Sequence, residues 1–527
     1  MRVLLVEPAY RKNHRRTKGH PPTEAESAFT KMDDDSLWYP PLGLMKLAAF
    51  HKNRRDAVQF AYGCDKTILK EKGSFFGVGS WHRVYITTLF TFNWKTTIET
   101  IEFYKKLVDE VPDKIFVGGI MASLMSHEIY EETGVRPVSG VINSPKQIGL
   151  DGNDNIDLLP PDYGILRDHP YAINDTYYAY TTRGCVNECE WCGVPTIEPT
   201  YIPYIDIKEM INKLREQYGD KSKLKLMDNN VVASPQLDKI VSDLLELGYG
   251  KNSYTKTKRP KQRVVDFNQG LDATFVTEDT IKLLAQLNIK PMRIAFDRIQ
   301  EKDDYVRALR LTKKYGARMF SNYMLYNCKD SPRDLYDRLL VNIRLGQKWR
   351  DRKGKPTATI YSYPMRYAPI RSENLPGENR GRDYDGPISN VGRDYLMNSA
   401  WTKRFTRNIE VMKGAAHGAI SATPSLARRT IGETYEEFIA NLYMPQEMLR
   451  NRNKYEKRVH RSEPSRRPGT GDIEDFRSFI RRLLKTQDEK FLRFHEAVSQ
   501  NRRKEIRDYL DECEDEEIRK WLEFYLQ

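Results

Sequence analysis

Three cysteines lie close together in the stretch Arg183-Gly184-Cys185-Val186-Asn187-Glu188-Cys189-Glu190-Trp191-Cys192-Gly193, which follows an apolar run. Three thiolates on one loop can bind three irons of a four-iron, four-sulfur (4Fe-4S) cluster. No fourth cysteine lies nearby, so the fourth iron would have no protein ligand. An open metal position is typical of a chemical site, because structural metal sites use their full set of ligands. The alternative is a zinc site, but zinc sites have four ligands and usually paired CxxC spacing.

The CxxxCxxC spacing, with Trp191 directly before the third cysteine, resembles the signature of the radical S-adenosylmethionine (radical SAM) superfamily. The resemblance implies that Cys185, Cys189 and Cys192 bind the cluster, with Trp191 beside the cofactors. It also implies that SAM chelates the open iron through its amino and carboxylate groups. Reductive cleavage of SAM would release methionine and a 5′-deoxyadenosyl radical. Such an enzyme needs an electron donor, such as flavodoxin or ferredoxin.

Residues 151–376 are predicted to form the open (β/α)6 barrel of radical SAM enzymes. Strands are predicted at 177–182, 223–227, 264–267, 293–296, 319–325 and 357–363, and helices between them at 205–218, 236–247, 278–287, 303–315 and 333–347. Residues 151–175 are rich in Pro, Asp and Gly, which predicts a linker that leads into the barrel. Such barrels place their chemistry at the carboxyl ends of the strands.

Polar side chains follow the predicted barrel strands. They are Asp228-Asn229-Asn230, Asn268-Gln269-Gly270 with Asp272, Asp297-Arg298, Asn327 and Arg366-Tyr367. By resemblance, the first trio occupies the place of the superfamily's "GGE" element, which contacts the methionine amino group. Asp297 falls where the fourth strand of the family contacts the ribose or carboxylate, and Asn327 falls near its adenine-binding fifth strand. Asn268 is a further candidate for cofactor binding. The alternative for each residue is a helix N-cap or a loop turn.

Residues 1–150 alternate between strand and helix patterns, which is typical of a parallel sheet covered on both faces. Strands are predicted at 2–6, 58–62, 84–88, 115–117 and 138–142, and helices at 42–52, 96–108 and 123–132. This rhythm indicates an α/β domain of the flavodoxin-like type, whose ligands lie beyond the carboxyl ends of the strands.

Two of these strand ends, Thr87-Thr88-Leu89 and Gly118-Gly119, are separated by 28 residues. The spacing resembles the SxL…GG part of cobalamin-binding domains, with Thr87 in place of the serine. The resemblance implies that Thr87, Leu89, Gly118 and Gly119 contact cobalamin. Glycines let the backbone approach a bulky ligand, and a hydroxyl can bond its nucleotide tail.

The DxHxxG motif, whose histidine ligates cobalt in that family, has no counterpart in this chain. The corresponding region contains Trp38-Tyr39-Pro40-Pro41-Leu42-Gly43, which resembles the N-terminal domains of cobalamin-type radical SAM enzymes. Those enzymes commonly lack the histidine, so cobalt ligation stays open. The alternative is a flavodoxin-like domain that has lost its ligand and only covers the active site.

Residues 377–460 are predicted to be an α-rich extension, and residues 461–527 a basic linker followed by a helical appendage. The polar insert 371–386 could fold over the barrel mouth as a lid. Two sets of apolar residues repeat with helical period in the appendage, which predicts helices with one apolar face each. They are Phe476, Phe479, Ile480, Leu483 and Leu484, and then Ile518, Trp521, Leu522, Tyr525 and Leu526.

The composition of the 527 residues predicts a soluble chain of about two to four domains. The remaining cysteines, Cys64, Cys328 and Cys513, are scattered singly, which favours a reducing cytoplasm over a disulfide framework. No run of about 18 apolar residues occurs, and the first residues do not form a signal peptide, so no membrane association is expected. Cys328 could be a second reactive thiol, but a lone cysteine is more often a small buried hydrophobe.

The net charge of +13 is concentrated in two stretches. Residues 251–263 carry six basic residues and no acid, and residues 446–471 carry eight basic and three acidic residues. Residues 251–263 precede a barrel strand and are therefore expected at the amino-terminal face, opposite the chemistry. We therefore expect any binding of nucleic acid to be nonspecific.

These patterns together predict a cytoplasmic radical SAM enzyme, of the cobalamin-dependent type, that methylates an unactivated carbon. One alternative is a cobalamin-independent radical SAM enzyme that catalyses a rearrangement, an oxidation or a sulfur insertion. A second alternative is an iron–sulfur redox or nucleic-acid-binding module without radical catalysis. No motif in the sequence identifies the substrate.

Overall fold

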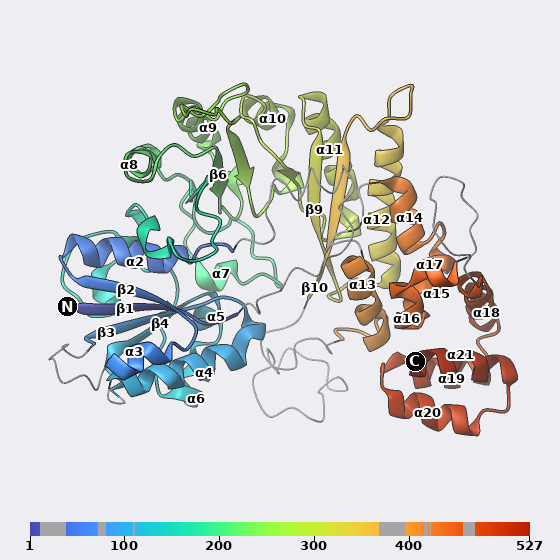
Figure 1. Cartoon of the computed structure of the whole chain (residues 1–527). Coiled ribbons are helices and arrows are strands. Elements are labelled where there is room, and N and C mark those ends of the chain that lie inside the picture. Colours follow the sequence, from blue (N-terminus) through green and yellow to red (C-terminus); the bar gives the residue numbers. More distant parts are fainter. Residues whose placement is uncertain are drawn as a thin grey trace.

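The computed structural model describes residues 1–10, 38–71, 81–108, 111–367, 396–415, 420, 423–456 and 470–527. Its first part is a parallel sheet with strand order β2-β1-β3-β4 (Figure 1). The strands are β1 (Arg2–Glu7), β2 (Ala57–Tyr62), β3 (Arg83–Thr88) and β4 (Ile115–Gly119). The helices of this part are α2 (Leu42–Asn53), α3 (Lys66–Glu71), α4 (Trp94–Lys105), α5 (Ile120–Leu124) and α6 (Ser126–Thr133).

The inner residues of the central strand β1, Val3 to Val6, are all apolar because both faces of the strand are buried. Leu4 and Val6 pack in the core under α4, while Val3 and Leu5 pack in the core under α2. A parallel strand covered on both faces has this continuous apolar pattern rather than an alternating one. The prediction of a doubly covered α/β domain is confirmed.

The prediction of a fifth strand at 138–142 is wrong: the described residues of this sheet form four strands. Val138 forms only an isolated bridge with Gly118. Pro137 has no N–H to donate, and Gly140 has φ +79°, which turns the chain out of the extended conformation. The order β2-β1-β3-β4 is that of a flavodoxin-like sheet without its fifth strand.

The second part is an arc of six parallel strands that starts at residue 176. The strands are β5 (Thr176–Ala179), β6 (Lys223–Leu226), β7 (Val264–Phe267), β8 (Met292–Arg293), β9 (Met319–Tyr326) and β10 (Thr359–Arg366). They form two three-stranded sheets, β5-β6-β7 and β8-β9-β10, which the bridges Val265–Ile289 and Leu271–Ile294 connect. The predicted strand at 293–296 continues beyond β8 as extended chain, since the N–H groups of Ile294 and Phe296 donate to carbonyls of β9.

Five helices alternate with these strands, as predicted. They are α8 (Lys208–Tyr218), α9 (Leu237–Glu246), α10 (Glu278–Leu284), α11 (Lys302–Lys314) and α12 (Pro332–Lys348). The predicted linker 151–175 packs closely against both parts of the chain. Tyr163, Leu166 and Tyr171 are buried, and Tyr171 pairs with Trp38 from the segment before α2. Met45 of α2 is buried in the barrel core together with these three residues, so the sheet domain packs directly on the barrel.

The C-terminal part is helical and packs beside β10 (Figure 1). Its helices are α13 (Lys403–Ala415), α14 (Pro424–Ile431), α15 (Tyr435–Tyr443), α16 (Gln446–Arg450), α17 (Arg452–Tyr455), α18 (Asp472–Thr486), α19 (Glu489–Ser499), α20 (Arg503–Glu512) and α21 (Glu516–Leu526). The predicted apolar faces of α18 and α21 are buried or partly buried. Buried Arg404 of α13 donates to the carbonyl of Val498, which attaches the appendage to the extension.

The proposed lid at 371–386 and most of the basic linker lie outside the described residues. None of the helices in the described ranges is long and apolar enough to span a membrane. Residues 251–263 connect α9 to β7 and so lie at the amino-terminal face of the barrel, as expected. The nonspecific binding of nucleic acid there stays a prediction.

Candidate active site

Residues 183–193, called the cluster loop below, follow β5 at the carboxyl end of the barrel. The three cysteines are free, with Cys185 and Cys189 half-buried and Cys192 exposed. Backbone N–H groups of Asn187 and Val194 donate to Sγ of Cys185 and of Cys192, each at 3.4 Å. Burial and the proximity of the two other cysteines raise the pKa of Cys189 to about 11. Bound metal replaces such protons, because the thiolate is the ligand.

This donor set fits an iron–sulfur cluster with one open iron. Within the described ranges, no group of three or more His, Cys, Asp or Glu side chains is close enough together to hold a single metal ion. A four-iron cluster requires more widely spaced ligands than a single ion, because each thiolate binds a different iron. Backbone N–H groups directed at sulfur are a feature that tunes such clusters.

The start of the cluster loop is held by a buried ion network of Lys46, Asp157, Arg183 and Glu198. Arg183 donates to Asp157 and, at 2.7 Å, to Glu198 Oε1, while Lys46 Nζ lies 2.7 Å from Asp157 Oδ1. The guanidinium group also lies 3.3 Å from the ring centroid of Tyr180. Burial alone would raise the pKa of Asp157, but the attraction of Lys46 and Arg183 outweighs it and lowers that pKa.

Glu198 also fixes the backbone of the loop. Its second carboxylate oxygen accepts the N–H of Gly184 at 2.7 Å and an amide N–H of Asn229 at 2.9 Å. Gly184 has φ +70°, and a Cβ there would lie 2.6 Å from the carbonyl oxygen of Thr200. Only glycine fits this turn without strain. The network thus shapes the loop directly before the first cysteine.

Asp228, Asn229 and Asn230 follow β6 and lie beside the cluster loop. Oδ1 of Asp228 accepts the N–H and hydroxyl groups of Thr181 and Thr182. Oδ2 of Asp228 and Oδ1 of Asn230 are buried, and neither has a hydrogen-bond partner among the described residues. Burial raises the pKa of Asp228. Since buried acceptors are usually satisfied, these two orphan oxygens can accept hydrogen bonds from a ligand with N–H or O–H donors.

Asp272 connects Asn230 to the cluster loop, a contact that we did not predict. Its Oδ2 accepts the side-chain amides of Asn187, at 2.7 Å, and of Asn230, at 3.3 Å. Its Oδ1 caps the following turn at Thr274. Asn187 lies between the first two cysteines, and this position was the only feature of the sequence that could have indicated its contact with Asp272.

Trp191, Asp297 and Arg298 form another side of the site. The guanidinium group of Arg298 lies 5.4 Å from the ring centroid of half-buried Trp191, and Glu301 holds it at 2.6 Å. Burial raises the pKa of Asp297 to about 6, and its Oδ1 accepts the N–H of Leu325. Asp297 is therefore mostly ionised at neutral pH.

Asn268 and Asn327 are engaged in contacts within the chain. Asn268 accepts the hydroxyl of Tyr39 at 3.0 Å, and Lys225 Nζ donates to the same hydroxyl at 2.6 Å. Asn327 is fully buried with φ +61°; its amide donates to the carbonyl of Tyr367 and accepts the N–H of Met397. The predicted contact of Asn327 with adenine stays a prediction, and its side chain is already used to join β9 to the C-terminal part.

The four residues predicted to contact cobalamin lie together at the carboxyl ends of β3 and β4 in the sheet domain. Thr87 pairs with Gly118, and Leu89 follows the end of β3. Gly119 has φ +107°, and a Cβ there would lie 2.3 Å from the carbonyl oxygen of Thr88. Thr88, which we did not single out, holds this turn: its hydroxyl donates to the Gly118 carbonyl and accepts the N–H of Ala122.

The helix that follows these strand ends packs directly against the end of the cluster loop. Helix α5 follows Gly119 and contacts α7 (Val194–Ile197), which follows the third cysteine (Figure 1). A Cβ on Gly193 would lie 3.2 Å from both terminal carbons of Leu124, and one on Gly140 would lie 3.4 Å from the carbonyl oxygen of Ile197. The two sites that the sequence predicts separately are therefore neighbours.

No protein-family model and no curated protein matches this chain. Among solved structures, the radical S-adenosylmethionine methyltransferase TsrM from Kitasatospora setae, with cobalamin and a [4Fe-4S] cluster bound, has a TM-score of 0.51 at 13% identity, over 91% of this chain and 99% of TsrM. The cobalamin-dependent S-adenosylmethionine radical enzyme OxsB, with aqua-cobalamin and S-adenosylmethionine bound, has a TM-score of 0.53 at 12% identity, over 99% of this chain and 83% of OxsB. The chain therefore has the fold of cobalamin-dependent radical SAM enzymes.

Proposed function

We propose that the chain is a radical SAM enzyme that cleaves SAM reductively on a 4Fe-4S cluster and uses cobalamin to methylate an unactivated carbon. The packing of α5 on α7 carries this proposal, because it brings the Gly118-Gly119 turn beside the third cysteine. TsrM, which has a similar fold, binds both cobalamin and a cluster. A cluster that served only as an electron carrier would need no second cofactor site at this position.

The bound cofactors supply the radical and the methyl donor, which protein side chains cannot provide. The residues of the chain bind and orient them. Cys185, Cys189 and Cys192 would bind the cluster, and the orphan oxygens of Asp228 and Asn230 suit the amino group of SAM. Charge-assisted hydrogen bonds of this kind are roughly twice as strong as neutral ones.

The remaining predicted residues would complete the two cofactor sites. Ionised Asp297 can accept a ribose hydroxyl, and Trp191 offers a flat apolar surface backed by Arg298. We assign cobalamin to the strand ends at Gly118 and Gly119, with Thr87 paired to Gly118 and Leu89 at the adjacent strand end. Tyr39 reaches from the sheet domain to Asn268 and Lys225, so it connects the two parts at the barrel mouth.

Replacing Asp228 by Asn should weaken SAM binding about 10- to 100-fold. The substitution removes the charge of the orphan oxygen, and a hydrogen bond to a charged group contributes about 1.5–3 kcal/mol. Calorimetric titration of SAM into anaerobically reconstituted protein measures the effect. The matched control is Asp243→Asn, since Asp243 is similarly buried and, among the described residues, its carboxylate is already paired with Tyr204 and Lys208. Equal affinities in both variants would contradict the role given to Asp228.

The cobalamin site is tested by anaerobic gel filtration after reconstitution with cobalamin. We expect one cobalamin per chain, and a Co(II) paramagnetic resonance spectrum without nitrogen splitting from histidine. The physical reason is that, among the described residues, none of the four strand ends of the sheet domain carries a histidine. His51 is buried and bonded to Asp56 and Tyr85. Protein that retains no cobalamin but still releases 5′-deoxyadenosine from SAM would favour the covering-domain alternative.

A further inference from the structure

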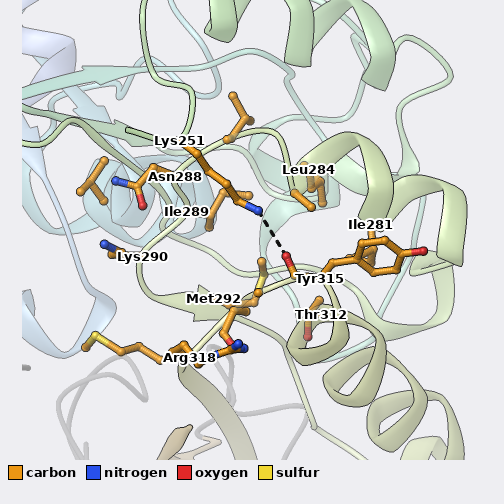
Figure 2. A pocket seen from close by; sticks show the side chains of 16 residues that line it. Lys251, Ile281, Leu284, Asn288, Ile289, Lys290, Met292, Thr312, Tyr315 and Arg318 are labelled. Carbon is orange, nitrogen blue, oxygen red and sulfur yellow. Dashed lines mark hydrogen bonds between the residues drawn. The ribbon is translucent and has the colours of Figure 1, made fainter. Parts of the chain in front are cut away.

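A cavity of about 510 Å³ lies at the opposite end of the barrel from the cysteines. Figure 2 shows the side chains that line it. It opens where β7, β8 and β9 begin, at Val264, Met292 and Met319, and helices α10 and α11 border it. These strand starts define the amino-terminal face, whereas the cluster loop follows the carboxyl end of β5. The cavity is therefore separate from the candidate active site.

The walls of the cavity are mainly aliphatic. Ile281, Leu284 and Leu287 contribute side chains that are otherwise buried in the barrel core. The polar groups of the wall are already bonded: the amide of Asn288 donates to the Arg263 carbonyl, and the hydroxyl of Thr312 to the Ala308 carbonyl. A ligand inside would meet an apolar surface with flexible methionines, which adapt to ligand shape.

Three cations, called the rim cations below, stand around this apolar space: Lys251, Lys290 and Arg318. In the described part of the chain, each bonds to a neutral oxygen and none to a carboxylate. Lys251 donates to the Tyr315 carbonyl at 3.3 Å, Lys290 to the Gln262 side chain at 3.2 Å, and Arg318 to backbone carbonyls. No acidic residue lines the cavity.

We propose that this cavity binds an alkyl chain with an anionic head group, a carboxylate or a phosphate. The volume lies in the range of pockets that enclose small organic ligands. The aliphatic walls remove the alkyl chain from water, and the rim cations pair with the head group. The ligand would lie far from the cluster loop, so it is not the substrate of the radical chemistry.

This assignment gives part of the basic stretch 251–263 a different role from binding nucleic acid. Lys251 belongs to the rim, and Arg263 is buried and paired with Asp220 at 2.8 Å. Lys256, which is exposed and does not line the cavity, serves as a matched control.

The test is calorimetric titration of the full-length protein with four probes: decanoate, decyl phosphate, decanol and inorganic phosphate. We expect decanoate and decyl phosphate to bind at least about 10-fold more tightly than decanol, and inorganic phosphate not to bind, because both the chain and the charge are needed. The stronger of the two anions identifies the head group. No binding of either anion, or equal binding of decanol, would overturn the proposal.

Two variants locate the binding. The double variant Lys251→Gln, Arg318→Gln should weaken binding of the better anion at least about 10-fold, since it removes two charge-assisted contacts, while Lys256→Gln should not. Ala285→Leu, which fills the cavity from the end of α10, should abolish binding. Melting curves confirm that each variant is folded. Unchanged binding in both the double variant and Ala285→Leu would place the ligand elsewhere and contradict the proposal.

Discussion

Replacing any one of Cys185, Cys189 and Cys192 by alanine is expected to reduce release of 5′-deoxyadenosine from SAM to the level of protein without a cluster. In the proposed site each thiolate would bind one iron, and the loss of one ligand would leave a cluster held by two residues. The iron content and the 5′-deoxyadenosine formed after chemical reduction are measured on the same anaerobic samples. The visible absorption of the cluster should fall together with the activity.

The matched control is Cys64→Ala. Cys64 is exposed in the sheet domain, and among the described residues its thiol contacts Thr100 at 3.9 Å, far from the cluster loop, so iron content and cleavage should be unchanged. A variant that lacked all three loop cysteines but still retained iron and cleaved SAM would refute the assignment. If protein without cobalamin still cleaved SAM but no longer methylated its substrate, the cluster would be assigned to cleavage and cobalamin to methyl transfer.

Much of the fold could be predicted because the chain buries its parallel strands on both sides. Such strands appear in the sequence as short continuous apolar runs, and β1 and β7 match the predictions closely. Most helix boundaries agree within a few residues, since each helix has one apolar face. The predicted helix at 123–132 is instead two helices, α5 and α6, and the short α3 was not predicted. The false strand at 138–142 shows the limit: its apolar residues pack under the sheet edge, but Pro137 and Gly140 prevent a ladder.

Apart from the cysteine motif and the SxL…GG spacing, the candidate site was predictable where strand ends carry polar residues. Asp228 and Asn230 belong to this class, and their orphan oxygens add an observation that no sequence pattern contains. Asp272, Asn187 and Thr88 act through contacts that depend on how distant loops meet. Asp157, Arg183 and Glu198 are also far apart in sequence, and single charged residues in loops usually indicate solvent exposure rather than a buried network.

Replacing Arg183 by Gln should have the largest effect among residues that do not bind a cofactor. Arg183 is nearly buried between Asp157 and Glu198, and removal of one partner of a buried ion pair costs about 3–5 kcal/mol, because the remaining charges lose their compensation. The released Glu198 would no longer be fixed to accept the N–H of Gly184. We therefore expect a lower melting temperature, faster proteolysis within the cluster loop and slower uptake of iron by the apo protein.

Two further variants separate charge from geometry. Arg183→Lys keeps the charge but loses the fork that bonds two carboxylates at once, so it should fall between the wild type and Arg183→Gln. Arg482→Gln breaks an exposed pair with Glu517 in the appendage, which should change stability by at most about 1 kcal/mol. In the double variant Arg183→Gln, Glu198→Gln, the second substitution should cost less than it does in the wild type, because the contact between the two residues is already lost and only the bonds of Glu198 to Gly184 and Asn229 remain to be weakened. If apo Arg183→Gln took up iron as fast as the wild type and resisted proteolysis equally, the loop would be shaped by the cluster itself rather than by the buried ion network.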